Sequence, residues 1–387
     1  MRVQKPKHTL YIFLAVILCM VVCLVILKTG NTPEPVTMNV SLYKVVPDYD
    51  SFKKTIADRW KEKHPEVELN FENWDCYSGE VPEGLDVFVF DTISLDSFAE
   101  RGFLLALSEK DIQDYNDLIP SFVEGCRVNG TLYAIPQFLC ADLLYTRKND
   151  ADLKNVQNID DLYSVLGDSG LLLEKHSFTS KIGLYLQALI DEKQSYMDQY
   201  PPIKEGELSP IATDSLEKMR KMHLTDSEGD LEDESRFYYA RKFAEGMGRA
   251  YIGYSEAMNE MGESASDMDF RLFSMTDSKN IPVFYVDAAA INAKISSKKR
   301  ALALDLLNII TGTDALARAQ TNGGSPQYLL SARYSIYDAM ASDYPLYEEL
   351  KKIASVPDAF VFRIKPDGND YLEEAEKNKD AMLPLMK

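Results

Sequence analysis

The chain has 387 residues, enough for two or three domain-sized units, and its composition (45% hydrophobic, 11% aromatic, 27% charged) is that of a globular rather than a disordered protein. The formal net charge of −19 argues against nucleic acid as a partner and against docking on anionic lipid, because both carry charge of the same sign. The four histidines are scattered, so their spacing predicts neither a histidine metal site nor a cysteine–histidine pair, and we expect no metal and no cofactor.

The N-terminus is a targeting element. A basic stretch, residues 1–9, precedes the uncharged run Leu10–Leu27, whose 18 residues are just enough to span a bilayer, and a linker follows at residues 28–37. Because no small-residue cleavage site follows Leu27, we favour an uncleaved signal anchor, a transmembrane helix, over a cleaved signal peptide. In either case the basic end stays in the cytoplasm, so we expect an extracytoplasmic protein, membrane-anchored or secreted.

The first elements after the linker predict a βαβ unit. Met38–Tyr43 alternates like a strand, Asp50 is placed to cap a helix that Pro65 stops, and Val67–Phe71 is the next strand. The apolar stripe of that helix consists of Phe52, Ile56 and Trp60. Two strands separated by one helix within about 35 residues indicate a parallel sheet.

The next buried strand, Leu85–Asp91, is almost continuously apolar and ends in a carboxylate. Open α/β sheets bind ligands at the carboxyl ends of their strands, so Asp91 is a candidate ligand-binding residue. The alternative role is the N-cap of the segment that follows, and one carboxylate can serve both purposes.

The Asn-Gly pair at residues 129–130 predicts a tight turn, after which the chain runs through the apolar stretch Tyr133–Tyr145 and its single thiol, Cys140. We expect this strand to cross the molecule. A cysteine there is either an inert small apolar side chain or a reactive thiol. The sequence leaves open whether Cys76 and Cys126 form a disulfide, and we expect Cys140 to stay outside any bridge.

The second half of the chain is predicted to be mostly helical between residues 158 and 249, with a solvated acidic loop at Asp226–Ser235. Two further buried strands, Ala250–Glu256 and Ile281–Asp287, also end in carboxylates and lead into helices expected at Ala257–Met261 and Ala288–Ala293. An amphipathic helix is expected at residues 298–311, and the remainder to residue 387 reads as helical with a break at 322–326.

The order of these segments resembles the type II periplasmic binding protein fold, in which two α/β lobes are joined by crossing strands and ligand binds between them. The hairpin that leads from Gly130 to Pro136 carries this resemblance, which covers nearly the whole chain after residue 38. Within that fold the sequence is similar to the thiaminase I (thiamine pyridinylase) family. Five segments in the same order carry this closer likeness: Trp74–Tyr77, Asp86–Asp91, Pro136–Cys140, Gly253–Glu256 and Tyr285–Asp287.

The resemblance implies a transferase that displaces the thiazole of thiamine with a small organic nucleophile (an amine, a pyridine or a thiol). It places the nucleophile on Cys140, the general base on Glu256 and the pyrimidine-binding carboxylates on Asp91 and Asp287. The tyrosines expected to wall the substrate are Tyr43, Tyr77, Tyr239, Tyr254 and Tyr285. Without the resemblance, Glu256 would be read as a carboxylate that balances a helix dipole.

This chemistry suits the residue types. A cysteine thiolate adds readily to an electron-poor ring carbon, a carboxylate can accept the thiol proton, and tyrosine faces attract a cationic thiazolium. The resemblance further implies lobe 1 at residues 38–141 and 288–325, lobe 2 at 142–287 and 326–387, and we expect a monomer. The alternatives are a membrane-tethered solute-binding protein without catalysis and a cysteine hydrolase, for which no histidine lies at a strand end.

Overall fold

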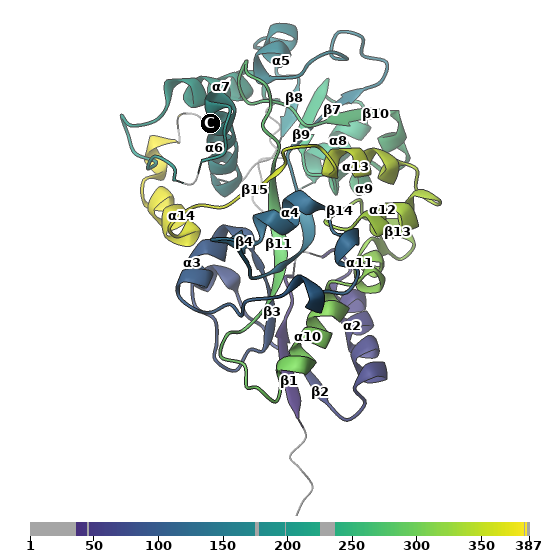
Figure 1. The fold of residues 1–387 in the computed structure, drawn as a ribbon. Helices are drawn as coiled ribbons and strands as arrows, with labels where there is room; N and C mark the ends of the chain where they lie inside the picture. The colour runs from purple at the N-terminus through teal and green to yellow at the C-terminus, as the bar shows by residue number, and fades with distance from the viewer. Residues whose placement is uncertain are drawn as a thin grey trace, which may run out of the picture.

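The computed structural model describes residues 36–44, 46–174, 178–197, 199–224, 237–382 and 384, arranged as two lobes, each built on its own β-sheet (Figure 1). The predicted basic N-terminus and signal anchor lie outside the described residues, and so does the acidic loop. Among the helices within these ranges, none combines the length and the apolar character that crossing a bilayer requires.

The larger sheet has the strand order β14-β6-β11-β3-β1-β2, with β15 paired to β11. Its strands are β1 (Thr37–Ser41), β2 (Glu68–Phe71), β3 (Val87–Asp91), β6 (Ile135–Cys140), β11 (Val283–Ile291), β14 (Leu330–Ser331) and β15 (Phe360–Val361). β1 is parallel to β2 and to β3, which confirms the predicted βαβ unit. β11 is antiparallel to both β3 and β6, so the sheet is mixed rather than parallel throughout.

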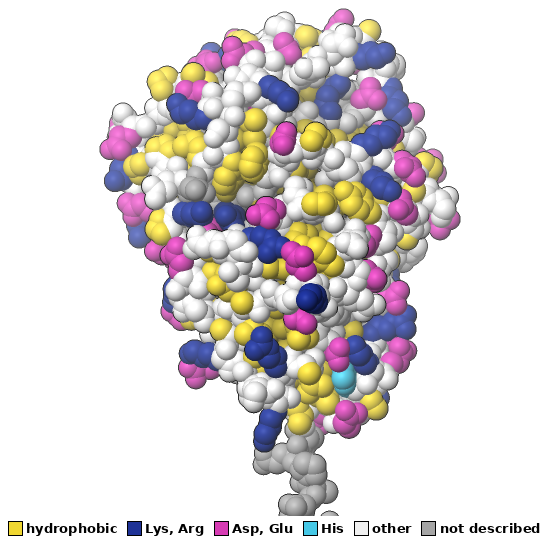
Figure 2. Space-filling view, viewed as in Figure 1, with side chains coloured by type: hydrophobic (Ala, Val, Ile, Leu, Met, Phe, Trp, Pro, Cys, Tyr) yellow, Lys and Arg dark blue, Asp and Glu magenta, His cyan; other side chains and the backbone are white. Residues whose placement is uncertain are grey.

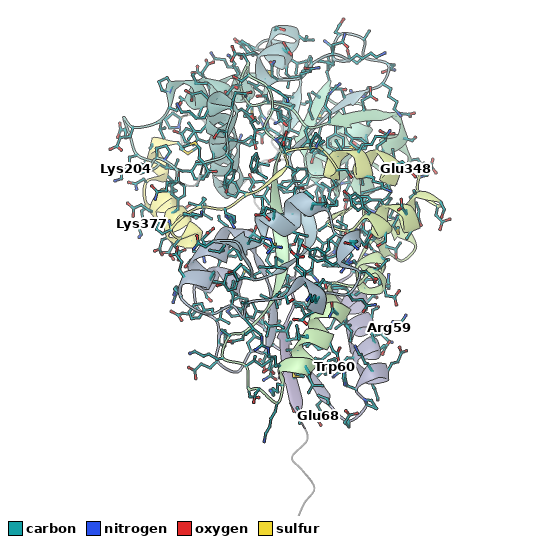
Figure 3. The ribbon with its side chains drawn as sticks, in the orientation of Figure 1. Arg59, Trp60, Glu68, Lys204, Glu348 and Lys377 are labelled. Atoms are coloured by element: carbon teal, nitrogen blue, oxygen red, sulfur yellow. The ribbon has the colours of Figure 1, made fainter. Side chains whose placement is uncertain are left out.

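Helix α2 (Tyr49–Lys63) covers this sheet with the predicted stripe, since Phe52, Ile56 and Trp60 are all buried. The indole nitrogen of Trp60 donates a hydrogen bond to the backbone oxygen of Val67 at 3.0 Å, which ties the helix to the chain entering β2 (Figure 3). The N-cap is Asp48, whose side chain accepts from the backbone nitrogen of Ser51, so the expectation of a cap at Asp50 was wrong by two residues.

The Asn-Gly turn is confirmed as a hairpin between β4 (Arg127–Val128) and β5 (Thr131–Leu132). Asn129 and Gly130 both have positive φ, 51° and 77°, the conformation that this type of turn requires. The remaining helices of the larger-sheet lobe are α3 (Leu95–Glu100), α4 (Pro120–Gly125), α10 (Arg300–Ile310), α11 (Thr313–Ala319), α12 (Tyr334–Ala341) and α13 (Leu346–Ala354). The break predicted at 322–326 is a small hairpin of β12 (Thr321–Asn322) and β13 (Ser325–Pro326).

The smaller sheet has the order β10-β7-β9-β8 and lies at the opposite end of the molecule (Figure 1). Its strands are β7 (Leu143–Arg147), β8 (Leu172–Glu174), β9 (Ala250–Gly253) and β10 (Met268–Arg271). The helices of this lobe are α5 (Ile159–Leu166), α6 (Phe178–Lys193), α7 (Pro210–Met222), α8 (Tyr238–Ala244), α9 (Ala257–Met261) and α14 (Gly368–Lys377). Side chains of α6, α7 and α14 share a core of their own with this sheet.

The chain passes between the lobes where β6 leads into β7, where β10 leads towards β11, and where β15 leads towards α14. The expected lobe boundaries need two corrections. All of β11 belongs to the larger sheet, including residues 283–287, and it continues as a strand through the alanines 288–290 where a helix was expected. Residues 326–361 also belong to the larger-sheet lobe, because β14 pairs with β6 and β15 pairs with β11.

Candidate active site

A cavity of about 570 Å³ lies between the lobes and is lined from both. The larger sheet contributes the ends of β3 and β6 and the first half of β11, while α6, α14 and the loop after β9 contribute the other side. Of the residues predicted from the sequence, those that line the cavity are Tyr43, Tyr77, Asp91, Cys140, Tyr254, Tyr285 and Asp287. Positions far apart in the sequence therefore meet in one cavity.

Cys140 and Glu256 approach each other across the cleft. Cys140 is the last residue of β6 and pairs with Tyr285 of β11, so the sheet fixes the position of its side chain. Glu256 follows β9 in the other lobe, and its Oε1 lies 4.0 Å from Sγ of Cys140. A thiol and a carboxylate at this distance are positioned for proton transfer once they close by a few tenths of an ångström.

Glu256 occupies the N-cap position of α9, at the helix N-terminus where its alternative role was to balance the helix dipole. Its side chain makes no capping hydrogen bond there. The carboxylate is 4% exposed and is directed at Cys140 through Oε1, while Oε2 accepts from the hydroxyl of Ser255 at 3.3 Å. The geometry thus favours contact with the thiol over capping.

Asp91 and Asp287 form a facing pair of carboxyl groups, because they are direct partners in the antiparallel register of β3 and β11. Burial raises the pKa of Asp287 well above its usual range, and the charges of Asp91 and Glu256 raise it further. Burial also raises the pKa of Asp91, although the backbone nitrogen of Ile93 and the hydroxyl of Tyr77 both donate to it at 2.9 Å. Since the backbone bond caps the 3₁₀ helix η2 (Thr92–Ser94), Asp91 is a cap as well as a cavity residue.

The cavity tyrosines are neutral hydrogen-bonding groups. Burial, followed by the neighbouring carboxylates, raises the pKa of Tyr43 and of Tyr285 above the usual tyrosine value. The hydroxyls of Tyr43 and Tyr77 lie 3.0 Å apart and form a hydrogen bond. The hydroxyl of Tyr77 in turn donates to the carboxylate of Asp91. These rings offer flat faces to a ligand and at the same time hold one carboxylate in place.

Cys76 and Cys126 do not form the disulfide that the sequence left open. Both side chains are buried, and burial raises the pKa of each thiol to about 12. A thiol with so high a pKa supplies almost no thiolate at neutral pH. Of the three cysteines in the described part of the chain, Cys140 is the one that lines the cavity.

The chain is similar to known proteins over most of its length. The Thiaminase-1 domain family matches residues 141–276. The curated Thiaminase-1 of Paenibacillus thiaminolyticus is 36% identical over 368 residues, which are 90% of this chain and 88% of the relative. The solved structure of Clostridium botulinum thiaminase I in complex with thiamin is 37% identical, with a TM-score of 0.82 over 90% of this chain and 100% of that one.

The chain belongs to the thiaminase I family. It is accordingly an enzyme of the thiamine pyridinylase class, and the expected family is confirmed. The fold is also the expected two-lobed type II periplasmic binding protein-like fold. Maltose-bound MalE3 of T. maritima shares it at 18% identity, with a TM-score of 0.62 over 90% or more of both chains (91% of this chain and 95% of that one).

Among the described residues that line the cavity, Tyr239 is the one predicted substrate tyrosine that is missing. It lies on α8 and is 1% exposed. Its ring packs edge-on against His223 and Tyr238, with centroids 5.7 and 5.3 Å away. The aromatic packing of the smaller-sheet lobe accounts for this position.

Several lining residues were not predicted, and most lie on α6 and α14. They are Ile93, Ser180, Ile182, Gly183, Leu186, Phe362, Asn369, Leu372, Glu373 and Glu376. Gly183 is there because of its size, since a Cβ at this position would lie 2.3 Å from the hydroxyl of Tyr285. No local motif marks these residues, because each sits on an ordinary amphipathic helix or in a connecting segment.

The ionisable side chains in the cavity lining include acidic residues but no basic ones among the described residues. The lining includes four carboxyl groups, those of Asp91, Asp287, Glu373 and Glu376, and within the described ranges no lysine, arginine or histidine. This contrasts with the outer face, where acidic and basic side chains are interspersed (Figure 2). Among the described residues no cluster of three or more histidines, cysteines and carboxylates has the arrangement of a metal site. Such a lining attracts a cation, and its aromatic faces favour a flat one.

Proposed function

We propose that the cavity binds thiamine and degrades it by transferring the pyrimidine methylene group to a small organic nucleophile, through a covalent intermediate on Cys140. The thiol proton passes to Glu256, and Sγ forms a bond to an electron-poor carbon of the pyrimidine ring. The bond between the methylene carbon and the thiazolium nitrogen then breaks, and its electron pair leaves with the neutral thiazole. The observation that carries the proposal is the 4.0 Å approach of Cys140 and Glu256 across a cavity lined with carboxylates.

The second half of the reaction restores the enzyme. The nucleophile forms a bond to the methylene carbon and the bond between the ring and Sγ breaks. With a pyridine, Glu256 returns the thiol proton to the departing sulfur. With an amine, Glu256 first releases the thiol proton to water. It then accepts a proton from the attacking amine and passes this second proton to the departing sulfur.

Asp91 and Asp287 recognise the aminopyrimidine in this proposal. The raised pKa of Asp287 favours a proton on the pair. The protonated group donates to a ring nitrogen and makes the ring a better electron sink, while the other carboxylate accepts from the exocyclic amine. The tyrosines of the cavity stack on the ring and contact the thiazolium cation. The solved structure of Clostridium botulinum thiaminase I in complex with thiamin supports this choice of ligand.

The test is release of the thiazole alcohol from thiamine in the presence of pyridine or an aromatic amine, followed by chromatography. We expect release by the wild-type protein and a loss of at least about a hundredfold in Cys140→Ser and in Glu256→Gln, as is usual for a nucleophile and a general base. Glu260→Gln, one turn further along α9, makes the same charge change away from the cavity and leaves the rate unchanged.

A different result would point to the non-catalytic alternative. If thiamine binds but is recovered intact, and both variants bind it as tightly as the wild type, the chain is a solute-binding protein and the roles of Cys140 and Glu256 are wrong.

The location and assembly of the protein are also proposals. The basic residues before Leu10–Leu27 support export with the catalytic lobes outside the cytoplasm. The cavity is completed by a single chain, which supports a monomer. Fractionation of cells that produce the full chain, followed by immunodetection, tests whether the N-terminal segment holds the enzyme at the membrane or is removed.

A further inference from the structure

The α6–α14 side of the cavity differs in chemistry from the side that carries Cys140. Where the larger sheet contributes tyrosines, carboxyl groups and the thiol, this side presents the apolar side chains of Ile182, Leu186 and Leu372. Glu373 and Glu376 follow on α14 and are exposed to solvent. The result is an apolar wall with carboxylates along it, which is the environment that an aromatic cation prefers.

Asn369 supplies a polar group on this wall. Its side chain is 8% exposed and lines the cavity, while Oδ1 accepts from the hydroxyl of Ser94 at 3.2 Å. Within the described part of the chain no partner accepts from its side-chain NH₂ group. A buried amide that lines a cavity with its donor unused is placed to hydrogen-bond a ligand there.

The two glutamates are not equivalent. Glu376 forms an ion pair with Lys379 at 2.7 Å, which offsets part of its charge. Glu373 makes no ion pair or hydrogen bond with any described residue, so its charge acts on the cavity undiminished by a cation. Glu373 is therefore the residue on this wall with the most influence on a charged ligand.

We propose that Asn369, Leu372 and Glu373 form, with α6, the subsite that holds the departing thiazole and then the incoming nucleophile. This subsite selects uncharged aromatic nitrogen bases over thiolates. The inference rests on the proposed function and assigns residues to its choice of nucleophile. A pyridine enters without charge and becomes a pyridinium cation when its nitrogen bonds to the methylene carbon, so the nearby carboxylate stabilises the developing charge. A thiolate enters as an anion and is repelled by the same carboxylate.

The experiment is a competition between two acceptors. The full chain is mixed with thiamine, pyridine and 2-mercaptoethanol at pH 8, and the ratio of pyridinium product to thioether product is measured by chromatography. Because both products arise from the same substrate in the same tube, this ratio depends neither on how much enzyme is folded nor on how tightly thiamine binds.

We expect Glu373→Gln to lower the ratio of pyridinium to thioether about two- to fivefold, the range that one solvent-exposed charge supplies. Asn369→Asp keeps an acceptor for Ser94 and adds a carboxylate, so it should raise the ratio by at least about twofold. The matched control is Glu374→Gln, since Glu374 neighbours Glu373 on α14 and is not part of the cavity lining. It should leave the ratio unchanged.

Opposite shifts in Glu373→Gln and Asn369→Asp support the inference. Shifts of the same sign, unchanged ratios, or an equal effect of Glu374→Gln overturn it while leaving the proposed function intact. If the wild-type protein releases no thiazole with either acceptor, the proposed function fails and this inference fails with it.

Discussion

Burial raises the pKa of both aspartates of the cavity, and the pKa of Asp287 is raised further by the charge of Asp91, which it faces. Asp91 and Asp287 are register partners on neighbouring strands, so ionising both places two negative charges side by side in a cavity partly shielded from water. Burial, then the charge of Asp91, raises the pKa of Asp287. One shared proton is the arrangement that relieves this repulsion, and it is also the arrangement that suits a ligand with one donor and one acceptor.

This pair predicts a pH-dependent effect of Asp287→Asn on stability. A carboxyl group whose pKa is raised by folding contributes fully below its unfolded pKa, near 4, and its contribution is lost as the pH rises through the raised value. The amide cannot ionise, so the variant avoids that loss. We expect the melting temperature of Asp287→Asn to exceed that of the wild type by more at pH 8 than at pH 5, as measured by thermal unfolding followed by circular dichroism.

Asp58→Asn is the control for this measurement, because Asp58 is exposed on α2 and, among the described residues, pairs only with Lys54 across one helical turn. Its difference from the wild type should be small at both pH values. A difference for Asp287→Asn that is the same at pH 5 and pH 8 would show that the pair does not hold a proton at neutral pH.

At the residue scale, strand-end positions in the sequence pointed to part of the cavity lining. Asp91 and Cys140 each end a buried strand, where a carboxylate or thiol is visible in the sequence, whereas Asp287 lies in the middle of β11 because that strand continues to Ile291. Nothing in the local sequence identifies Asn369 and Glu373 as cavity residues. They reach the cavity only because a segment more than 200 residues after Cys140 crosses back between the lobes.

At the scale of elements, Asp191 fixes helix α6 to the loop that precedes β11. The carboxylate is fully buried and accepts from the backbone nitrogens of Met275 and Ile281, each at 2.8 Å. The side chain of Gln187, one turn earlier, donates to it at 2.9 Å. Because α6 lines the cavity, this anchor sets the position of one wall.

We predict that Asp191→Ala lowers the free energy of unfolding by about 2–5 kcal/mol, because it leaves the buried backbone N–H of Met275 and the partly buried one of Ile281 without an acceptor, at about 1–3 kcal/mol each. Urea unfolding measures the change. Lys193→Ala, two residues away on an exposed side chain, should change stability by less than about 0.5 kcal/mol. A loss for Asp191→Ala no larger than that of the control would mean that the loop finds other acceptors.

The elements that the sequence missed are those that tertiary pairing creates. β8 and β10 have 3 and 4 residues, too short for an alternating pattern to stand out from the helices around them. The alanines at 288–290 favour a helix by propensity, but β3 and β6 pair with β11 on both sides and hold them in a strand. The hairpin at Asn129-Gly130 and the stripe of α2 were predictable because their signals are local.

At the scale of the whole molecule, the segment from Phe362 to Lys377 binds the two lobes together. Asp96 of α3, in the larger-sheet lobe, lies 3.2 Å from the guanidinium of Arg363, while Tyr196 of the other lobe donates its hydroxyl hydrogen to the backbone oxygen of Arg363 at 2.6 Å. Further along, Asp367 accepts from the hydroxyl of Ser97, and Tyr371 donates to the backbone oxygen of Pro201 at 2.8 Å. α14 is thus fixed to both lobes, and with it one wall of the cavity.

This connection predicts that Asp96→Ala weakens both stability and substrate binding. The side chain of Asp96 is 2% exposed and faces Arg363 and Lys365, so its removal leaves two cations without their shared carboxylate. Breaking a buried pair costs about 3–5 kcal/mol, and because Arg363 and Lys365 are partly solvated we expect a loss of about 2–4 kcal/mol in urea unfolding. The KM for thiamine should rise in thiazole-release assays, since α14 is no longer held against the larger-sheet lobe.

The control is Glu100→Ala, which removes an exposed carboxylate from the same helix. It should change neither the unfolding free energy nor the KM. If Asp96→Ala lowers stability but leaves the KM at the wild-type value, the segment stabilises the fold without positioning the cavity wall. The acceptor competition, repeated in the Asp96→Ala background, then tests whether the selectivity assigned to Glu373 depends on this anchor. An unchanged ratio of pyridinium to thioether product would mean that Glu373 keeps its place at the cavity without the contact between Asp96 and Arg363.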